Sequence, residues 1–201
     1  MSNEIIIRSN SRAVDFALLK NGKLIELHKQ NDSNKFNVGD IFLAKTKKTI
    51  SGLNAAFVNV GYEKDAFLHY HDLGPKVKTL MKFTKLVSEG KITNYSLEKL
   101  NFEKEIDKHG KIDDVLSPNN TILTQIIKEP ISTKGPRISS ELSFAGRFLV
   151  LIPFSNRISV SQKIKSKKER DRLKKLIEEF RPKGFGVIIR TVAHKGKKLL
   201  N

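Results

Sequence analysis

Residues 52–70 read Gly-Leu-Asn-Ala-Ala-Phe-Val-Asn-Val-Gly-Tyr-Glu-Lys-Asp-Ala-Phe-Leu-His-Tyr, and this stretch decides the expected fold. It contains two short runs rich in apolar residues, with turn-forming glycines at positions 52 and 61. One similar run precedes it and two follow. Five short strands separated by glycine turns favour a small closed barrel over an open sheet. The strands are expected at residues 41–49, 53–60, 64–70, 121–128 and 137–143.

A long segment, residues 74–118, interrupts the expected barrel after its third strand. It is polar and rich in lysine, with weak helical periodicity at residues 76–88 and 95–106. A connection of this length is either an insertion with helices of its own or a mobile excursion. The sequence leaves both alternatives open and indicates no function for the segment.

The amino-terminal residues predict a separate β segment. Residues 4–9 and 14–19 have the composition of short strands. Asn21-Gly22 tolerates the positive φ angles of a tight turn, and it predicts a hairpin across residues 14–29. Three short strands cannot bury a core alone, so we expect this segment to pack on something else.

A third group of elements follows the barrel. Residues 147–153 are typical of a strand that ends at a proline, and residues 157–161 are a weaker strand candidate. Ser166 and Glu169 have the spacing of a helix capping box. Together the elements predict an α+β fold that is mainly β. The apolar positions of the expected helix are Leu173, Leu176, Ile177 and Phe180, Pro182 and Gly184 end it, and a strand is expected at residues 185–192.

The charge of the chain indicates a polyanionic partner. Its formal net charge is +17, with 38 Lys and Arg against 21 Asp and Glu, and residues 162–201 hold 14 of the former and 4 of the latter. Nucleic acid fits better than a membrane, because no apolar run approaches the ~20 residues of a spanning helix. The absence of cysteine excludes disulfides and thiolate metal sites, and a cytoplasmic location is the simplest interpretation.

No set of residues predicts a catalytic centre in this sequence. Asp113 and Asp114 are adjacent, so on a strand they would point to opposite faces. His69 and His71 could share one strand face, but a third metal ligand is not evident near them. The phosphate-binding and nucleophile motifs of common enzymes are absent too. We therefore expect no catalytic residue, no metal site and no cofactor in this chain.

Two groups of residues could bind nucleic acid. Phe57 and Phe67 lie on neighbouring predicted strands, with His69 close by and Lys134 after the fourth strand. Aromatic side chains surrounded by cations can stack on unstacked bases and attract phosphates. The alternative is that both rings face a core, as most Phe side chains do. Arg190-Thr191, at the end of an apolar strand, could hold a terminal phosphate, or Arg190 could be a solvated strand end.

The same residues carry a resemblance to a known family. Residues 38–73, and above all the stretch from Gly52 to His69, resemble the S1 RNA-binding domain of the ribonuclease E/G family. The similarity continues through Lys134-Gly135, residues 142–153 and Gly186-Val-Ile-Ile-Arg-Thr191, in the same order and spacing. It covers nearly the whole chain except residues 74–118.

The resemblance implies an architecture of three parts. Residues 1–37 resemble the first piece of an RNase H-like subdomain whose remainder lies further along the full-length protein. Residues 38–143 resemble an S1 domain of the OB-fold type, a five-stranded barrel with the insertion at 74–118. Residues 144–201 resemble a small α/β subdomain, the 5′ sensor, which recognises RNA with a 5′ monophosphate.

The resemblance also implies roles for single residues. Phe57 and Phe67 match the family's base-stacking pair, which favours their exposure, and Lys134 matches a lysine that contacts the RNA backbone. The residues that match the 5′-phosphate pocket are Arg190, Thr191, Gly146 and Val150. This chain has Gln162-Lys163 where some relatives have paired arginines, and the lysines at 163–168 could compensate.

The catalytic part of the family requires an aspartate pair for magnesium and a Cys-Pro-x-Cys segment for a structural zinc, and neither is present here. We therefore expect that this chain does not cleave RNA alone, and that only the full-length enzyme forms an oligomer. Three functions stay open: the RNA-binding part of an endoribonuclease of RNA processing and decay, a stand-alone RNA-binding adaptor or decoy, and a ribosome-associated protein. The chain ends at the point where the resemblance implies that the RNase H-like part resumes, and this favours the RNA-binding part of an endoribonuclease.

Overall fold

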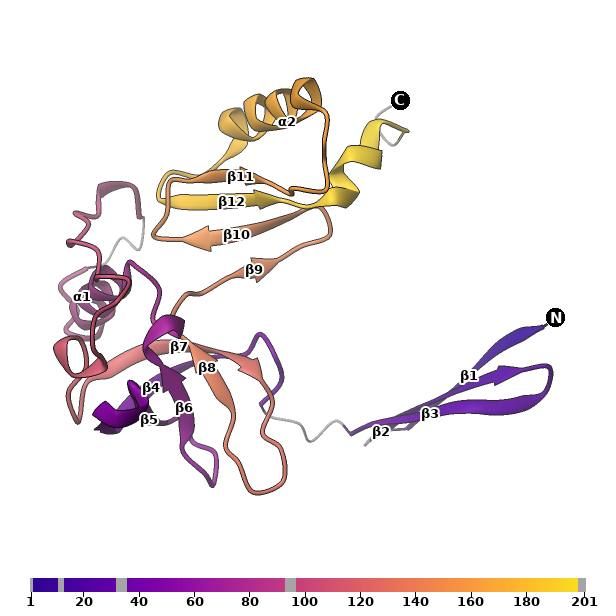
Figure 1. The fold of residues 1–201 in the computed structure, drawn as a ribbon, viewed down its shortest axis with the longest axis horizontal. Helices are drawn as coiled ribbons and strands as arrows, with labels where there is room; N and C mark the ends of the chain where they lie inside the picture. Colours follow the sequence, from indigo (N-terminus) through magenta and orange to yellow (C-terminus); the bar gives the residue numbers. More distant parts are fainter. Residues whose placement is uncertain (1, 11–12, 32–35, 93–96, 199–201) are drawn as a thin grey trace. The chain divides into compact units, whose positions relative to one another are not determined.

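The computed structural model describes residues 2–10, 13–31, 36–92 and 97–198. By their internal contacts these residues separate into two compact units, the first within residues 1–37 and the second within residues 38–201. Strands dominate both units, and the second unit adds two α-helices (Figure 1). The expectation of a mainly β fold is confirmed. No helix of the described residues is long and apolar enough to cross a membrane.

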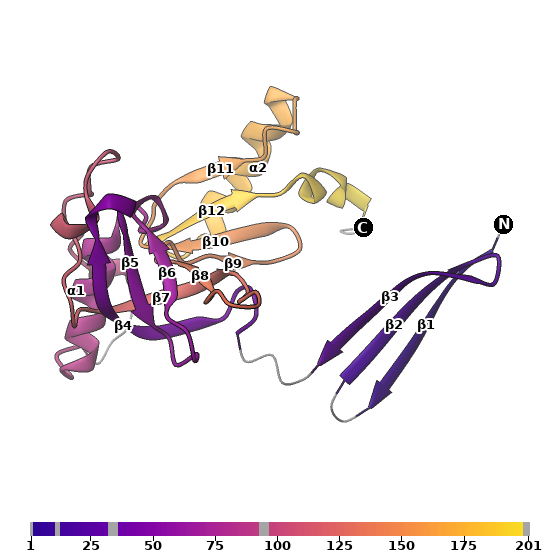
Figure 2. The ribbon, with the colours of Figure 1, turned by 60° about the horizontal axis from the view of Figure 1, so that its bottom comes forward.

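Five strands of the second unit close into a barrel, as the sequence predicts (Figure 2). The order around the barrel is β4-β5-β6-β8-β7, and every neighbouring pair is antiparallel except β6 and β8. This closed arrangement is consistent with an OB-like fold. The strands are β4 (Ile41–Ile50), β5 (Ala55–Asn59), β6 (Ala66–His69), β7 (Thr121–Lys128) and β8 (Arg137–Ser139).

Three of these strands are shorter than predicted, among them β6, which spans Ala66–His69 within the expected residues 64–70. Strand β5 begins only at Ala55, because Ser51–Leu53 form the 3₁₀ turn η1 and Asn54 takes a left-handed backbone with φ +45°. Strand β8 ends at Ser139, whose hydroxyl donates to the carbonyl of Asp72 at 2.7 Å. The interior of the barrel is mainly apolar and includes the fully buried Ala56, Val58, Ala66, Leu68, Ile122, Ile126 and Ile138, with Thr46 and Thr124 also buried.

Residues 74–118 form an insertion that packs on the barrel and contains one α-helix. Helix α1 (Val77–Ser88) confirms the first helical prediction, and Val77 and Leu80 are buried. The second prediction, a helix at 95–106, is wrong, since the described part of this range holds only the 3₁₀ turn η3 (Leu97–Lys99).

The reason for this difference is that the backbone after η3 bonds to the first helix and its approach. The amide of Glu103 donates to the Thr79 hydroxyl at 2.9 Å, and that of Ile106 donates to the Pro75 carbonyl at 3.1 Å. Ion pairs of Lys76 with Glu105 and of Lys82 with Glu103 accompany these bonds. These tertiary contacts replace the bonds of a second helix.

The end of the insertion is fixed to the barrel through Asn54. Its side-chain amide donates to the Gly110 carbonyl at 3.0 Å, and its side-chain oxygen accepts from the Ile112 amide at 2.7 Å. The buried Tyr70 donates its hydroxyl to the Asp107 carbonyl at 2.5 Å, and burial raises the pKa of this hydroxyl. Residues 107–112 are thereby held in place, and the turn η4 (Ile112–Asp114) follows them.

Four further strands form a second sheet in the order β11-β12-β10-β9. Helix α2 packs on this sheet through a core of Val160, Ile164, Leu173, Val187 and Ile189. Figure 1 shows the helix along one face. The elements are β9 (Phe144–Ala145), β10 (Leu149–Pro153), β11 (Ile158–Val160), α2 (Lys167–Phe180) and β12 (Phe185–Ile189).

The ends of α2 and β12 test the remaining local predictions. The Ser166 hydroxyl accepts from the Glu169 amide at 3.4 Å, which confirms the predicted cap at the start of α2. Strand β12 ends at Ile189, three residues before the predicted end, because Thr191–Lys198 form the 3₁₀ segment η5. Arg190 therefore lies at the junction of the strand and η5.

The first unit is a three-stranded antiparallel sheet of β1 (Asn3–Asn10), β2 (Ala13–Lys20) and β3 (Lys23–Asn31). The predicted hairpin is confirmed, with Asn21 at φ +51° and Gly22 at φ +74°. Within this unit many apolar side chains are exposed, and those of Ile5, Ile6, Ile7, Leu24, Ile25 and Leu27 exceed 50% exposure. A packing partner for this sheet stays a prediction.

We predict that Asn54→Ala destabilises the barrel and releases residues 107–112. The substitution removes two hydrogen bonds to part-buried backbone groups, and we expect the free energy of unfolding to fall by about 2 kcal/mol. Asn119→Ala is the matched control, because Asn119 also has a positive φ but is exposed. Urea titration and limited proteolysis measure both effects. Equal losses for the two variants would contradict the role of Asn54.

Candidate nucleic-acid interface

The side chains of β5 and β6 alternate between the inside and the outside of the barrel. Val58 and Leu68 are fully buried, whereas Phe57 and Phe67 are only half-buried, as expected for the period of two along a strand. The two Phe residues are direct cross-strand partners. The alternative that both rings fill the barrel core is therefore wrong, and both belong to its outer face.

A β-bulge places two lysines beside this aromatic pair. Thr46 pairs with Val58 but Lys48 pairs with Phe57, so Lys47 is an extra residue of β4. Thr46 is buried, and the bulge lets both following lysines face outward. The Lys48 ammonium lies 5.5 Å from the centroid of the Phe57 ring, and that of Lys47 lies 2.7 Å from the Asp65 carboxylate.

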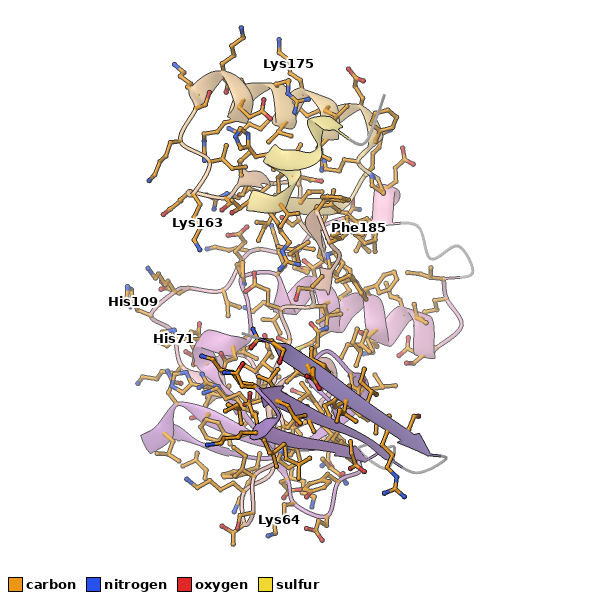
Figure 3. The ribbon with its side chains drawn as sticks, turned by 90° about the vertical axis from the view of Figure 1, so that its right-hand side faces the viewer. Lys64, His71, His109, Lys163, Lys175 and Phe185 are labelled. Carbon is orange, nitrogen blue, oxygen red and sulfur yellow. The ribbon has the colours of Figure 1, made fainter. Side chains whose placement is uncertain are left out.

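The rings form the apolar part of a groove of about 800 Å³. Phe57 and Phe67 contact each other edge to face with centroids 6.0 Å apart. Cations outnumber acids along the groove, so its potential favours an anion. Lys64, at one end of the barrel in Figure 3, is among them. The cations are Lys47, Lys48, Lys64, Lys128, Lys134 and Arg137, and the acids are Glu63, Asp65 and Glu129.

A tight turn places Lys134 at this groove. The amides and carbonyls of Ile131 and Lys134 bond to each other at 3.2 and 2.9 Å. Gly135 then lies so close to the β5–β6 connection that an added Cβ would come within 2.2 Å of the Asp65 carbonyl oxygen. Glycine is required for this approach, which explains why Lys134-Gly135 occurs as a pair.

The aromatic row continues from Phe67 toward the end of β6. The rings of Phe67 and His69 are 6.4 Å apart, and those of His69 and His71 are 5.0 Å apart. His69, expected to bind nucleic acid, is thus beside the aromatic pair. The sequence indicates His71 only as half of an incomplete metal site. Among the described residues no cluster of three or more metal-ligating side chains occurs.

The residues expected at a terminal phosphate lie on the second sheet. The exposed Arg190 donates from its guanidinium to the Gly146 carbonyl at 2.8 Å, and its amide donates to the Phe148 carbonyl at the same distance. Val150, on β10, pairs with Ala145 and Ile188. Arg190 and Gly146 are therefore in direct contact, and the arginine spans the turn between β9 and β10.

Thr191 has a partner that the sequence does not reveal. Its hydroxyl lies 2.9 Å from the hydroxyl of Ser161, because β11 and β12 pair in parallel and end side by side. The guanidinium of Arg170 donates to the carbonyls of Ser161 and Ile164 at 2.9 and 3.2 Å and fixes this turn. No short motif links residues so far apart, and only the strand pairing brings them together.

The fold and the groove together define an OB-like barrel with a cationic, aromatic outer face. Comparison with known proteins gives the family of the chain. A model of the family described as "Ribonuclease E/G family" matches residues 143–199. The chain is 28% identical over 193 residues to "Ribonuclease G" of Salmonella typhimurium, which covers 96% of this chain and 36% of that protein.

Two further relatives extend the comparison. "Ribonuclease G" of Haemophilus influenzae is 30% identical over 94% of this chain and 34% of its own length. "Ribonuclease E" of a Nostoc species is 32% identical over 78% of this chain and 19% of its own length. The chain belongs to the ribonuclease E/G family, which confirms the resemblance. It spans about a third of the length of the ribonuclease G relatives.

We predict that the two Phe rings contribute little to stability compared with an inward neighbour. Leu68→Ala should lower the free energy of unfolding by about 3 kcal/mol, because it leaves a cavity in the barrel. Phe57→Ala and Phe67→Ala should each lower it by only about 1 kcal/mol, since their rings are half-buried. Urea unfolding measures the three variants. Losses of about 3 kcal/mol for all three would indicate that the rings are part of the core.

Proposed function

We propose that this chain binds single-stranded RNA on the groove of its barrel, as the substrate-binding part of a ribonuclease E/G-type endoribonuclease. The observation that carries the proposal is the outward cross-strand pair Phe57 and Phe67 among six cations. Unstacked bases need a flat aromatic surface, and phosphates need cations beside it. The names of the relatives, ribonucleases G and E, support RNA as the partner.

In this proposal each part of the groove has its own role. Phe57 and Phe67 stack on bases, and His69 extends the row of rings. Stacking contributes about 1–3 kcal/mol for each base and depends little on sequence. Lys134 and the bulge lysines attract phosphates, which gives an affinity that falls with salt. The barrel is then an S1-type domain.

We propose further that the second sheet is a 5′ sensor for RNA with a terminal monophosphate. The Arg190 guanidinium is exposed, and the hydroxyls of Thr191 and Ser161 lie together at the end of β12. A guanidinium and hydroxyls are suitable donors to phosphate oxygens. In the complete enzyme, capture of the 5′ phosphate would favour a conformation that presses the RNA onto the catalytic part.

The remaining parts of the proposal concern the complete enzyme. Residues 1–37 would form the first piece of an RNase H-like subdomain, whose other strands would cover the exposed apolar side chains of this sheet. The magnesium-binding aspartates and the zinc-binding cysteines of the family would lie in the parts of the protein that this chain does not span.

A different candidate is an RNA-binding adaptor or ribosome-associated protein that does not read the 5′ end. The net charge of +17 favours it, because lysines alone support binding to any RNA. Such a protein would not need Arg190. The two candidates therefore differ in their dependence on the chemistry of the RNA terminus.

We predict that aromatic and cationic residues of the groove affect RNA binding in different ways. Phe57→Ala and Phe67→Ala should each weaken binding of a short unstructured RNA roughly tenfold, with an unchanged salt dependence. Lys134→Ala should lower the log–log salt slope by about 0.7, the share of one phosphate on a single strand. Fluorescence anisotropy at several salt concentrations measures both. The control is Lys175→Ala on α2. Unchanged affinity in folded Phe variants would reject the stacking role.

We predict that an RNA with a 5′ monophosphate binds more tightly than the same RNA with a 5′ hydroxyl, and that Arg190→Ala removes the difference. One charge-assisted contact contributes about 1.5 kcal/mol, which is roughly tenfold in affinity. Arg181→Ala is the control, since that guanidinium donates to the Phe185 carbonyl at 2.8 Å away from the proposed pocket. Equal binding of both RNAs to the unmodified protein would favour the adaptor.

A further inference from the structure

The row of aromatic rings on the barrel surface, which begins with Phe57 and Phe67, extends beyond the groove to His71. His71 follows β6 in the 3₁₀ turn η2 (Tyr70–Asp72), and it is exposed. Its ring lies 5.0 Å from that of His69 with an interplanar angle of 40°. Figure 3 labels His71 on the surface of the barrel. The outward face of β5 and β6 and the turn that follows therefore present four rings in a row, from Phe57 to His71.

A hydrogen bond joins the backbone of His71 to the ring of His69. The backbone amide of His71 donates to Nδ1 of His69 at 3.2 Å, which caps the turn η2. Nδ1 of His69 is the acceptor of this bond. The bond also fixes where His71 stands relative to the His69 ring.

The neighbours of His71 in η2 are an ion-paired carboxylate and a buried hydroxyl. Asp72 follows it in the chain, but its carboxylate accepts from the Arg137 guanidinium at 2.8 and 2.9 Å. Tyr70 is buried, and burial raises the pKa of its hydroxyl, which stays neutral at physiological pH. Imidazole is the side chain that ordinarily changes charge between pH 5 and 8.

We propose that His71 is a further RNA-binding residue, which stacks on the base beyond the one at Phe67 and His69 and, when protonated, attracts the neighbouring phosphate. This inference rests on the proposed RNA-binding function of the groove. Affinity for RNA is then higher where an imidazole is charged, and it falls as the pH rises through the range in which imidazoles ordinarily lose their proton. The barrel face thereby combines two apolar rings with two imidazoles.

The test compares variants that separate the ring from the charge. His71→Phe keeps an aromatic surface without a charge, and His71→Lys keeps a positive charge without a ring. Binding of a 5′-hydroxyl RNA is measured by anisotropy at pH 6 and pH 8, with thermal melting as a check of the fold. His194→Gln is the control at another histidine, which lies 3.5 Å from the carboxylate of Glu169 on α2.

The unmodified protein should bind RNA roughly threefold more tightly at pH 6 than at pH 8, the effect of one exposed ion pair. Its log–log salt slope should be steeper at pH 6 by about 0.7. Both differences should disappear in His71→Phe and His71→Lys and persist in His194→Gln. If they persist in the His71 variants while Phe67→Ala still weakens binding, this inference is wrong and the proposed function stands. If Phe67→Ala has no effect either, the proposed function itself fails.

Discussion

Closure of the five-stranded barrel is the constraint on which the rest of the structure depends. Once the sheet closes, one side of every strand is inside and the other outside, so the burial of Val58 and Leu68 forces Phe57 and Phe67 outward. The antiparallel register then places the two Phe rings opposite each other. The aromatic face is a geometric consequence of filling the core.

Local backbone irregularities add cations to this face, and strand pairing builds the candidate site on the second sheet. The bulge in β4 turns two successive lysines outward, and the close approach of Gly135 to Asp65 holds the turn that carries Lys134. On the second sheet the parallel pairing of β11 and β12 brings Ser161 to Thr191. In each of these three cases it is the geometry of the backbone that brings a common polar or charged side chain to the site. Sites of this kind depend on the fold more than on any motif.

Local sequence patterns predict the secondary-structure elements of this chain better than they predict its tertiary contacts. Glycine turns and apolar runs predict the five barrel strands, and Asn21-Gly22 predicts the hairpin. The face of Phe57 could not be predicted from the residues alone, because core and surface rings give the same pattern. The helix expected at 95–106 is lost to bonds with Thr79 and Pro75, which no local signal reveals. Ser161 and Thr191 are likewise joined only by tertiary structure.

The central claim is that RNA lies on the outer face of β5 and β6. Photo-crosslinking of a short oligouridine to the protein, followed by mass spectrometry of the crosslinked peptides, tests it most directly. The account predicts crosslinks at Phe57, Phe67 and the adjoining residues, since a zero-length crosslink requires a base in contact with the side chain. Crosslinks confined to α2 and its lysines, with none on the barrel face, would contradict it.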